Sequence, residues 1–92
     1  MPSYLVESYA ANRAEAIDDM RERAHVAAKL GADVRYVRTT FLPGDEVVLH
    51  MFEARSAEAL RHAARLAGLE HERIVEAVER AADPTRLVPD AA

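Results

Sequence analysis

Apolar and polar residues alternate in four short segments, and this alternation predicts four β-strands. The segments are residues 3–9, 34–42, 46–54 and 73–80. Pro43, Gly44 and Asp45 separate the second segment from the third, and these residue types are typical of tight turns. The second and third strands are therefore predicted to form a hairpin.

Two segments with helical spacing lie between these strands. In the first, Asn12 and Glu15 predict a capping box, and Gly31 predicts a left-handed end. In the second, Ser56 is the predicted N-cap, and Gly68 ends the helix. The buried stripes are predicted to be Ile17, Met20, Ala24, Ala27 and Ala28 in the first helix, and Leu60, Ala63, Ala64 and Ala67 in the second.

The resulting order of elements is βαββαβ, which predicts an α+β protein with a ferredoxin-like sandwich. Right-handed crossovers place both helices on one face of an antiparallel sheet with strand order 4-1-3-2. Residues 1–80 would form this single domain, and residues 81–92, which contain Pro84 and Pro89, would form a C-terminal tail.

The other face of the predicted sheet, the open face, would carry a contiguous apolar patch. The side chains expected to face the helices are Val6, Val37, Phe52 and Val75. Those expected on the open face are Leu5, Tyr36, Leu49, Met51, Ile74 and Val78. Such a patch is too large for a monomer to leave in water, so we expect a homodimer that packs the two open faces together.

Composition narrows the classes of partner and site. Half of the residues are hydrophobic but only five are aromatic, so the core of one subunit should be thin. A net charge of −4 with mixed signs argues against nucleic-acid binding. The absence of cysteine excludes disulfides and thiolate ligands. We find no signal peptide and no apolar run long enough for a membrane span, so a soluble cytoplasmic protein is expected.

Four stretches resemble a bacterial family of small ferredoxin-like proteins of unknown function that includes a nickel-binding protein. They are PSYLVESY, RYVRTTFLPGDE, HMFEARSAEALRHAARLAGL and ERIVEAVE, and together they span Pro2 to Glu79. The family signature falls on Phe52-Glu53-Ala54, Ser56, His62 and the segment Arg73 to Glu76. Relatives carry cysteine where this chain has His50, which would alter metal preference.

The resemblance implies a protein that binds nickel or another divalent transition metal. The residues to which we assign this role are His50, His62, His71 and Glu58. Glu58 and His62 are spaced i, i+4 on the second helix, so their side chains lie on one side of it. His71 stands between two glutamates just after that helix and could complete a site with His62, within one subunit or across a dimer.

Two other functions remain open. His50, in the middle of the third strand, could instead be a general base whose pKa is set by burial. The protein would then be a cofactor-free enzyme of the dimeric α+β barrel type, a monooxygenase, cyclase or isomerase with a pocket over His50 for a small molecule. Alternatively, each histidine is an ordinary surface or core residue, and the chain is an interaction domain.

Overall fold

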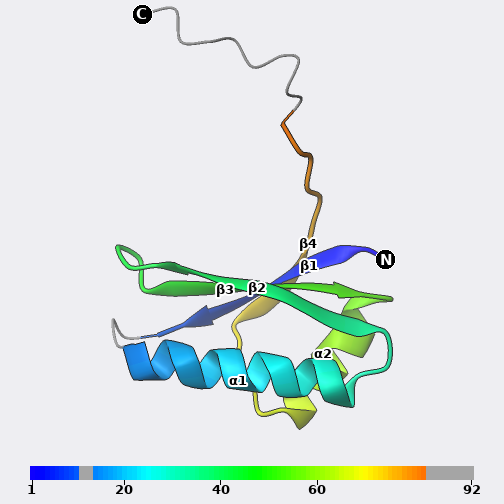
Figure 1. Cartoon of the computed structure of the whole chain (residues 1–92), viewed down its shortest axis with the longest axis horizontal. Coiled ribbons are helices and arrows are strands. Elements are labelled where there is room, and N and C mark those ends of the chain that lie inside the picture. Colours follow the sequence, from blue (N-terminus) through cyan, green and yellow to red (C-terminus); the bar gives the residue numbers. More distant parts are fainter. Residues whose placement is uncertain (11–13, 83–92) are drawn as a thin grey trace, which may run out of the picture.

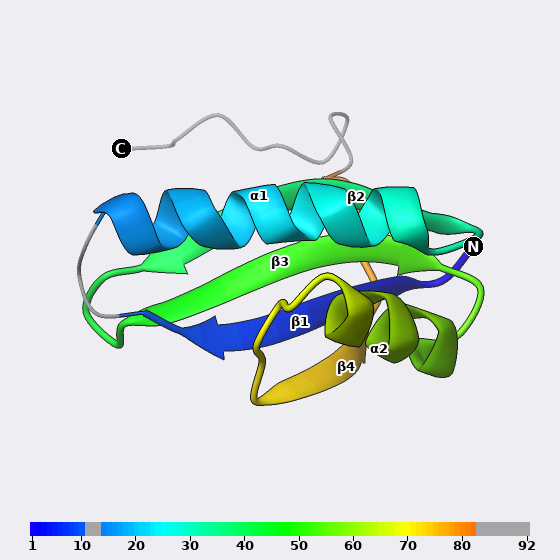
Figure 2. The same ribbon diagram turned by 90° about the horizontal axis from the view of Figure 1, so that it is seen from below.

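The computed structural model describes residues 1–10 and 14–82 and contains one sheet and two helices. The elements, in chain order, are β1 (Ser3–Tyr9), α1 (Ala14–Leu30), β2 (Val34–Leu42), β3 (Val47–Ala54), α2 (Ala57–Leu66) and β4 (Arg73–Ala77). The antiparallel sheet has the order β2-β3-β1-β4, which is the predicted order read from the opposite edge. Both helices cover one face of the sheet (Figure 1). Seen from that side, α1 runs along β2, and α2 lies near β4 (Figure 2). This is the predicted ferredoxin-like arrangement.

The two predicted ends of α2 are confirmed. The Ala59 N–H donates to the Ser56 side chain over 3.1 Å, so Ser56 caps the first turn. At the other end Gly68 has φ of +69°. Its N–H donates to the Arg65 carbonyl over 3.1 Å, and the Leu69 N–H donates to the Ala64 carbonyl over 2.9 Å. These two bonds form a Schellman motif, which requires the left-handed residue that glycine supplies.

The predicted end of α1 at Gly31 is right in position and wrong in mechanism. Gly68 is the only one of the three glycines with a positive φ, so Gly31 does not form a left-handed cap. A Cβ atom at Gly31 would lie 2.7 Å from Val34 Cγ2 and 2.8 Å from Ala63 Cβ. Glycine is needed there because the end of α1 packs closely against β2 and α2. Asn12 of the predicted capping box lies outside the described residues.

The core lies between the helices and the sheet. Phe52, Leu60 and Leu69 supply its largest fully buried apolar side chains. Six of the twelve residues in the core cluster are alanines, which lets the helices approach each other closely and adds little buried area per residue. The core of one subunit is therefore as thin as its composition predicts.

A β-bulge changes the predicted faces of β2. Tyr36 lies opposite Phe52 and Arg38 lies opposite Met51, so Val37 has no partner in the register with β3. The extra residue shifts the alternation by one position. Tyr36 and, beyond the bulge, Thr39 therefore point to the helix side. The prediction that Tyr36 faces away from the helices and Val37 faces them is wrong for this reason.

The faces of β4 are also shifted by one residue from the prediction. Ile74 pairs with Val6 and packs against the core, whereas Val75 pairs with Leu5 on the open face. The strand ends at Ala77 rather than at residue 80. Val78 therefore lies beyond the sheet and is 70% exposed.

The chain after β4 crosses the open face. β2 and β4 are opposite edges of the sheet, yet Arg38 of β2 forms an ion pair with Glu79. Figure 1 shows this segment leaving the sheet on the face opposite the helices. Met51, at the centre of the open face, is only 7% exposed although no helix covers it. The apolar open face thus consists of Leu5, Leu49, Met51 and Val75, with Glu79 beside it.

Candidate functional site

The most unusual buried group is the imidazole of His50. His50 sits in β3 between Val6 of β1 and Thr39 of β2, on the helix side as predicted. Its side chain is fully buried. Nδ1 lies 2.9 Å from Thr39 Oγ1, and Nε2 has no hydrogen-bond partner among the described residues.

Burial lowers the pKa of His50 to about 4, so the ring is neutral near pH 7. A neutral imidazole carries one N–H, and its position follows from the hydrogen bonds that surround it. An N–H on Nε2 would leave a buried donor without an acceptor. An N–H on Nδ1 donates to Thr39 Oγ1 and leaves only a lone pair unpaired, which is the less costly arrangement. We therefore assign the proton to Nδ1.

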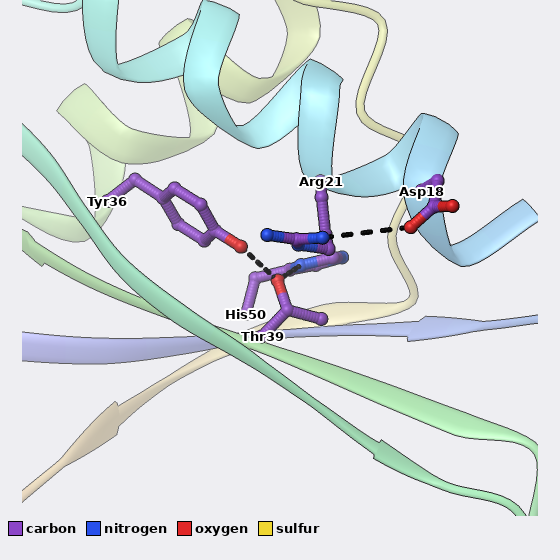
Figure 3. Close-up of polar contacts among 5 residues, drawn as sticks. All are labelled: Asp18, Arg21, Tyr36, Thr39 and His50. Atoms are coloured by element: carbon purple, nitrogen blue, oxygen red, sulfur yellow. Dashed lines mark hydrogen bonds and ion pairs between the residues drawn. The ribbon is translucent and has the colours of Figure 1, made fainter. Parts of the chain in front are cut away.

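Two hydroxyl groups extend this contact toward the surface. Thr39 Oγ1 is also hydrogen-bonded to the Tyr36 hydroxyl (Figure 3). Either hydroxyl can be the donor in this contact. In the arrangement in which Thr39 accepts from His50 and donates to Tyr36, the Tyr36 O–H is available to donate to a further group. The three side chains form one hydrogen-bonded chain, the His50–Thr39–Tyr36 chain, from the sheet interior outward.

The outer end of this chain opens into a pocket between α1 and β2 with a volume of about 500 Å³, here the Tyr36 pocket. Its lining residues are Arg21, His25, Tyr36, Val37, Arg38 and Thr39. The His25 ring contacts Tyr36 edge to face, with centroids 4.8 Å apart. Arg21 forms an ion pair with Asp18, in which Nη1 lies 3.7 Å from Oδ1 (Figure 3). A hydroxyl group beside the Arg21 guanidinium suits a carbonyl or an anionic oxygen.

The structure does not bring the four predicted metal ligands together. His50 is inside the sheet, whereas Glu58 and His62 are exposed on α2. His71 lies in the loop after α2, where its Nδ1 donates to the Leu69 carbonyl over 3.0 Å. Within residues 1–10 and 14–82, no group of three or more histidine, aspartate or glutamate side chains is placed to hold a metal ion. A nickel site within one subunit is therefore not supported, and nickel binding stays a prediction.

Sequence reasoning named His50 but missed Tyr36, Thr39 and Arg21 as its surroundings. The Thr39–His50 pair follows from counting outward from the hairpin turn, where Leu42 pairs with Val47. The predicted third strand begins at residue 46, one residue too early, so counting from its start shifts every pairing with β2 by one residue. The face to which Tyr36 points could not be predicted, because no feature of the local sequence indicates the bulge at Val37.

Comparisons with known proteins support the fold alone. No protein-family model matches the chain, and no curated protein is similar to it. A solved structure that is similar is that of SCO4226 from Streptomyces coelicolor A3(2). The match has a TM-score of 0.71 at 16% identity and covers 86% of this chain and 99% of that one. The described elements therefore form a small α+β domain with the same arrangement as that protein.

In the part of the chain that the structure describes, no helix has the length and hydropathy to span a membrane.

Proposed function

We propose that this protein is a cofactor-free enzyme of the dimeric α+β barrel type that isomerises a small carbonyl compound in the Tyr36 pocket. The observation that carries the proposal is the His50–Thr39–Tyr36 chain, which holds the Tyr36 hydroxyl in a fixed position at the pocket, where its O–H can donate to a substrate oxygen. His50 does not line the pocket and is fully buried, so its role is to position Thr39 and Tyr36 rather than to act as the base.

The proposed reaction needs no reagent beyond the substrate. Tyr36 donates its hydroxyl proton in a hydrogen bond to the substrate carbonyl oxygen. His25 accepts a proton from the adjacent carbon, and the electron pair of that C–H bond becomes the C=C bond of an enolate. The guanidinium group of Arg21, which lines the same pocket, stabilises the enolate oxygen. In a β,γ-unsaturated carbonyl compound the enolate is a dienolate, whose electron pair is shared with the γ-carbon. His25 returns the proton to that γ-carbon, and the C=C bond moves into conjugation with the C=O bond, which completes the isomerisation.

We infer that the enzyme acts as a homodimer in the cytoplasm. Two features support the homodimer: the alanine-rich core and the apolar side chains of Leu5, Leu49 and Val75 on the face that neither α1 nor α2 covers. Packing two such faces together would add the burial that one subunit lacks.

Proton exchange with solvent tests the proposal directly. The protein would be incubated in D₂O with a panel of 2-oxo acids and 1,3-dicarbonyl compounds, and loss of the α-proton signal would be followed by NMR. We expect exchange that falls roughly 100-fold in Tyr36→Phe, the effect of removing one donor to a developing oxyanion. A similar loss is expected in His25→Gln.

Thr40→Val is the matched control for Thr39→Val, because Thr40 pairs with Leu49 on the opposite face of the same strand. Thr39→Val should slow exchange, and Thr40→Val should leave it unchanged. Exchange at the buffer rate with every compound, or equal rates in the wild type and Tyr36→Phe, would contradict the proposal.

A further inference from the structure

A second and larger pocket lies away from the His50–Thr39–Tyr36 chain, where α2, the following loop and the ends of β1 and α1 meet. Its volume is about 620 Å³, and we call it the Arg61 pocket. The polar residues that line it and enter the argument are Arg61, Arg65, Glu70, His71 and Glu72. Neither the proposed isomerisation nor the predicted metal site accounts for it.

The two arginines of this pocket have no carboxylate partner among the described residues, a property that they share with Arg80. Six arginines of the described chain form ion pairs, namely Arg21, Arg23, Arg35, Arg38, Arg55 and Arg73. Among the same described residues, Arg61 and Arg65 form none. They are one helical turn apart on α2, where two like charges repel each other. An anion bound between them would remove that repulsion and accept hydrogen bonds from both.

The opposite wall of the pocket is a loop held firmly in place. Gly68 and Leu69 are fixed by the Schellman motif. The Ser8 hydroxyl donates to the Glu70 carbonyl over 2.7 Å, and the Glu72 N–H donates to the Glu7 carbonyl over the same distance. A wall that is ordered before binding costs a ligand little conformational entropy.

This loop offers acceptors where α2 offers donors. Nδ1 of His71 donates to the Leu69 carbonyl, so in the neutral ring Nε2 is the acceptor. The carboxylates of Glu70 and Glu72 line the same pocket. A ligand that satisfies both walls has a carboxylate at one end and an ammonium group at the other. Met20 and Tyr9 supply accessible apolar surface in the same pocket, since its other apolar residues, Ala64 and Leu69, are fully buried.

We propose that the Arg61 pocket binds a free α-amino acid with a small apolar side chain. Arg61 and Arg65 hold the α-carboxylate. His71 and the two glutamates accept hydrogen bonds from the α-ammonium group. The apolar surface of Met20 and Tyr9 contacts the amino-acid side chain.

Isothermal titration calorimetry of the full chain with L-alanine, L-valine and L-leucine tests this assignment. Two analogues of the tightest ligand, the amine without its carboxylate and the acid without its ammonium group, test the two walls separately. We expect binding by the amino acid and at least tenfold weaker binding by each analogue. Equal binding by the deaminated acid would reduce the pocket to a simple anion site and overturn the proposal. Absence of binding by all three amino acids, or binding only of dipeptides, would also overturn it.

Variants locate the site. Arg61→Gln and Arg65→Gln should each weaken binding tenfold or more, and both positions are exposed, so the fold should be retained. Arg55→Gln is the matched control, since Arg55 is an exposed arginine that pairs with Asp33 and does not line the pocket. Circular dichroism verifies that each variant is folded. Binding that survives both arginine changes would overturn the assignment.

Discussion

At the scale of single residues, His50 shows how the fold changes the chemistry of one side chain. An exposed histidine would be partly charged at pH 6.5, but burial in the sheet holds this one neutral down to a pKa of about 4. His50 therefore serves the Tyr36 pocket by donating a fixed hydrogen bond to Thr39, and it does not transfer a proton itself. The residue matters through the hydroxyl group that it orients.

The lowered pKa predicts a pH dependence of stability. In the unfolded chain His50 binds a proton below about pH 6.5, whereas in the folded protein it does so only below about pH 4. The contribution of a neutral His50 is therefore complete above pH 6.5 and is lost as the pH falls from 6.5 to 4. It amounts to roughly 3 kcal/mol across that window.

Urea denaturation at pH 7 and pH 4.5 measures this dependence. Replacing His50 with glutamine should remove most of the difference between the two pH values. His62→Gln is the control, because that histidine is exposed on α2 and should leave the difference unchanged. A His50→Gln protein with the full pH dependence of the wild type would contradict the explanation.

At the scale of the elements, close packing at the end of α1 gives a sharp prediction. A methyl group at Gly31 would overlap Val34 and Ala63 at under 3 Å, and both of these residues are buried in the core. Gly31→Ala should therefore destabilise the protein by about 1–3 kcal/mol, as overpacking does elsewhere.

Gly44→Ala provides the comparison within the same chain. An added Cβ at Gly44, in the turn after β2, meets nothing within 4 Å. That variant should unfold at the wild-type urea concentration or slightly above it. If both variants were equally stable, the packing argument for Gly31 would fail.

The existence and order of the elements could be predicted from the sequence because each has a local cause. Ser56 and Gly68 mark the ends of α2 through bonds made within a few residues, and the hairpin follows from its turn residues. The faces of β2 and β4 could not be predicted in the same way. Tyr36 reaches the helix side only because a bulge is inserted, and Ile74 does so because β4 takes its register from β1. Both are set by pairing between distant segments.

The same distinction applies to the candidate site. His50 was identifiable as a polar residue within an apolar strand. Its connection to a pocket depends on Tyr36 and the bulge, and therefore on tertiary structure. The predicted metal ligands relied on a family resemblance and on spacing within α2. Spacing alone could not bring Glu58, His62 and His71 into one coordination sphere.

At the scale of the whole molecule, the proposed dimer makes a prediction about mass. Native mass spectrometry should report two subunits, and Leu49→Arg should report one. The substitution would place one positive charge from each subunit within an apolar interface on the open face. A wild-type protein that is monomeric at micromolar concentration, or an undisturbed dimer of Leu49→Arg, would exclude the proposed interface.

The same spectra test the predicted nickel site. The described part of one subunit gathers no three candidate ligands, and the proposed dimer interface lies on the sheet face opposite α2. If His62 is a nickel ligand, stoichiometric Ni²⁺ uptake by metal-stripped protein should be lost in His62→Ala and retained in Leu49→Arg. Uptake that survives His62→Ala would place the metal on ligands other than those predicted.

The bulge at Val37 should also lower the tendency of the protein to aggregate at high concentration. β2 is an edge strand, and a regular edge offers a row of N–H and C=O groups to which a strand of another molecule can add. The extra residue interrupts that row in mid-strand. The other edge, β4, is only five residues long. The irregularity that turns Tyr36 toward its pocket therefore also makes the sheet a poor template for fibrous aggregation.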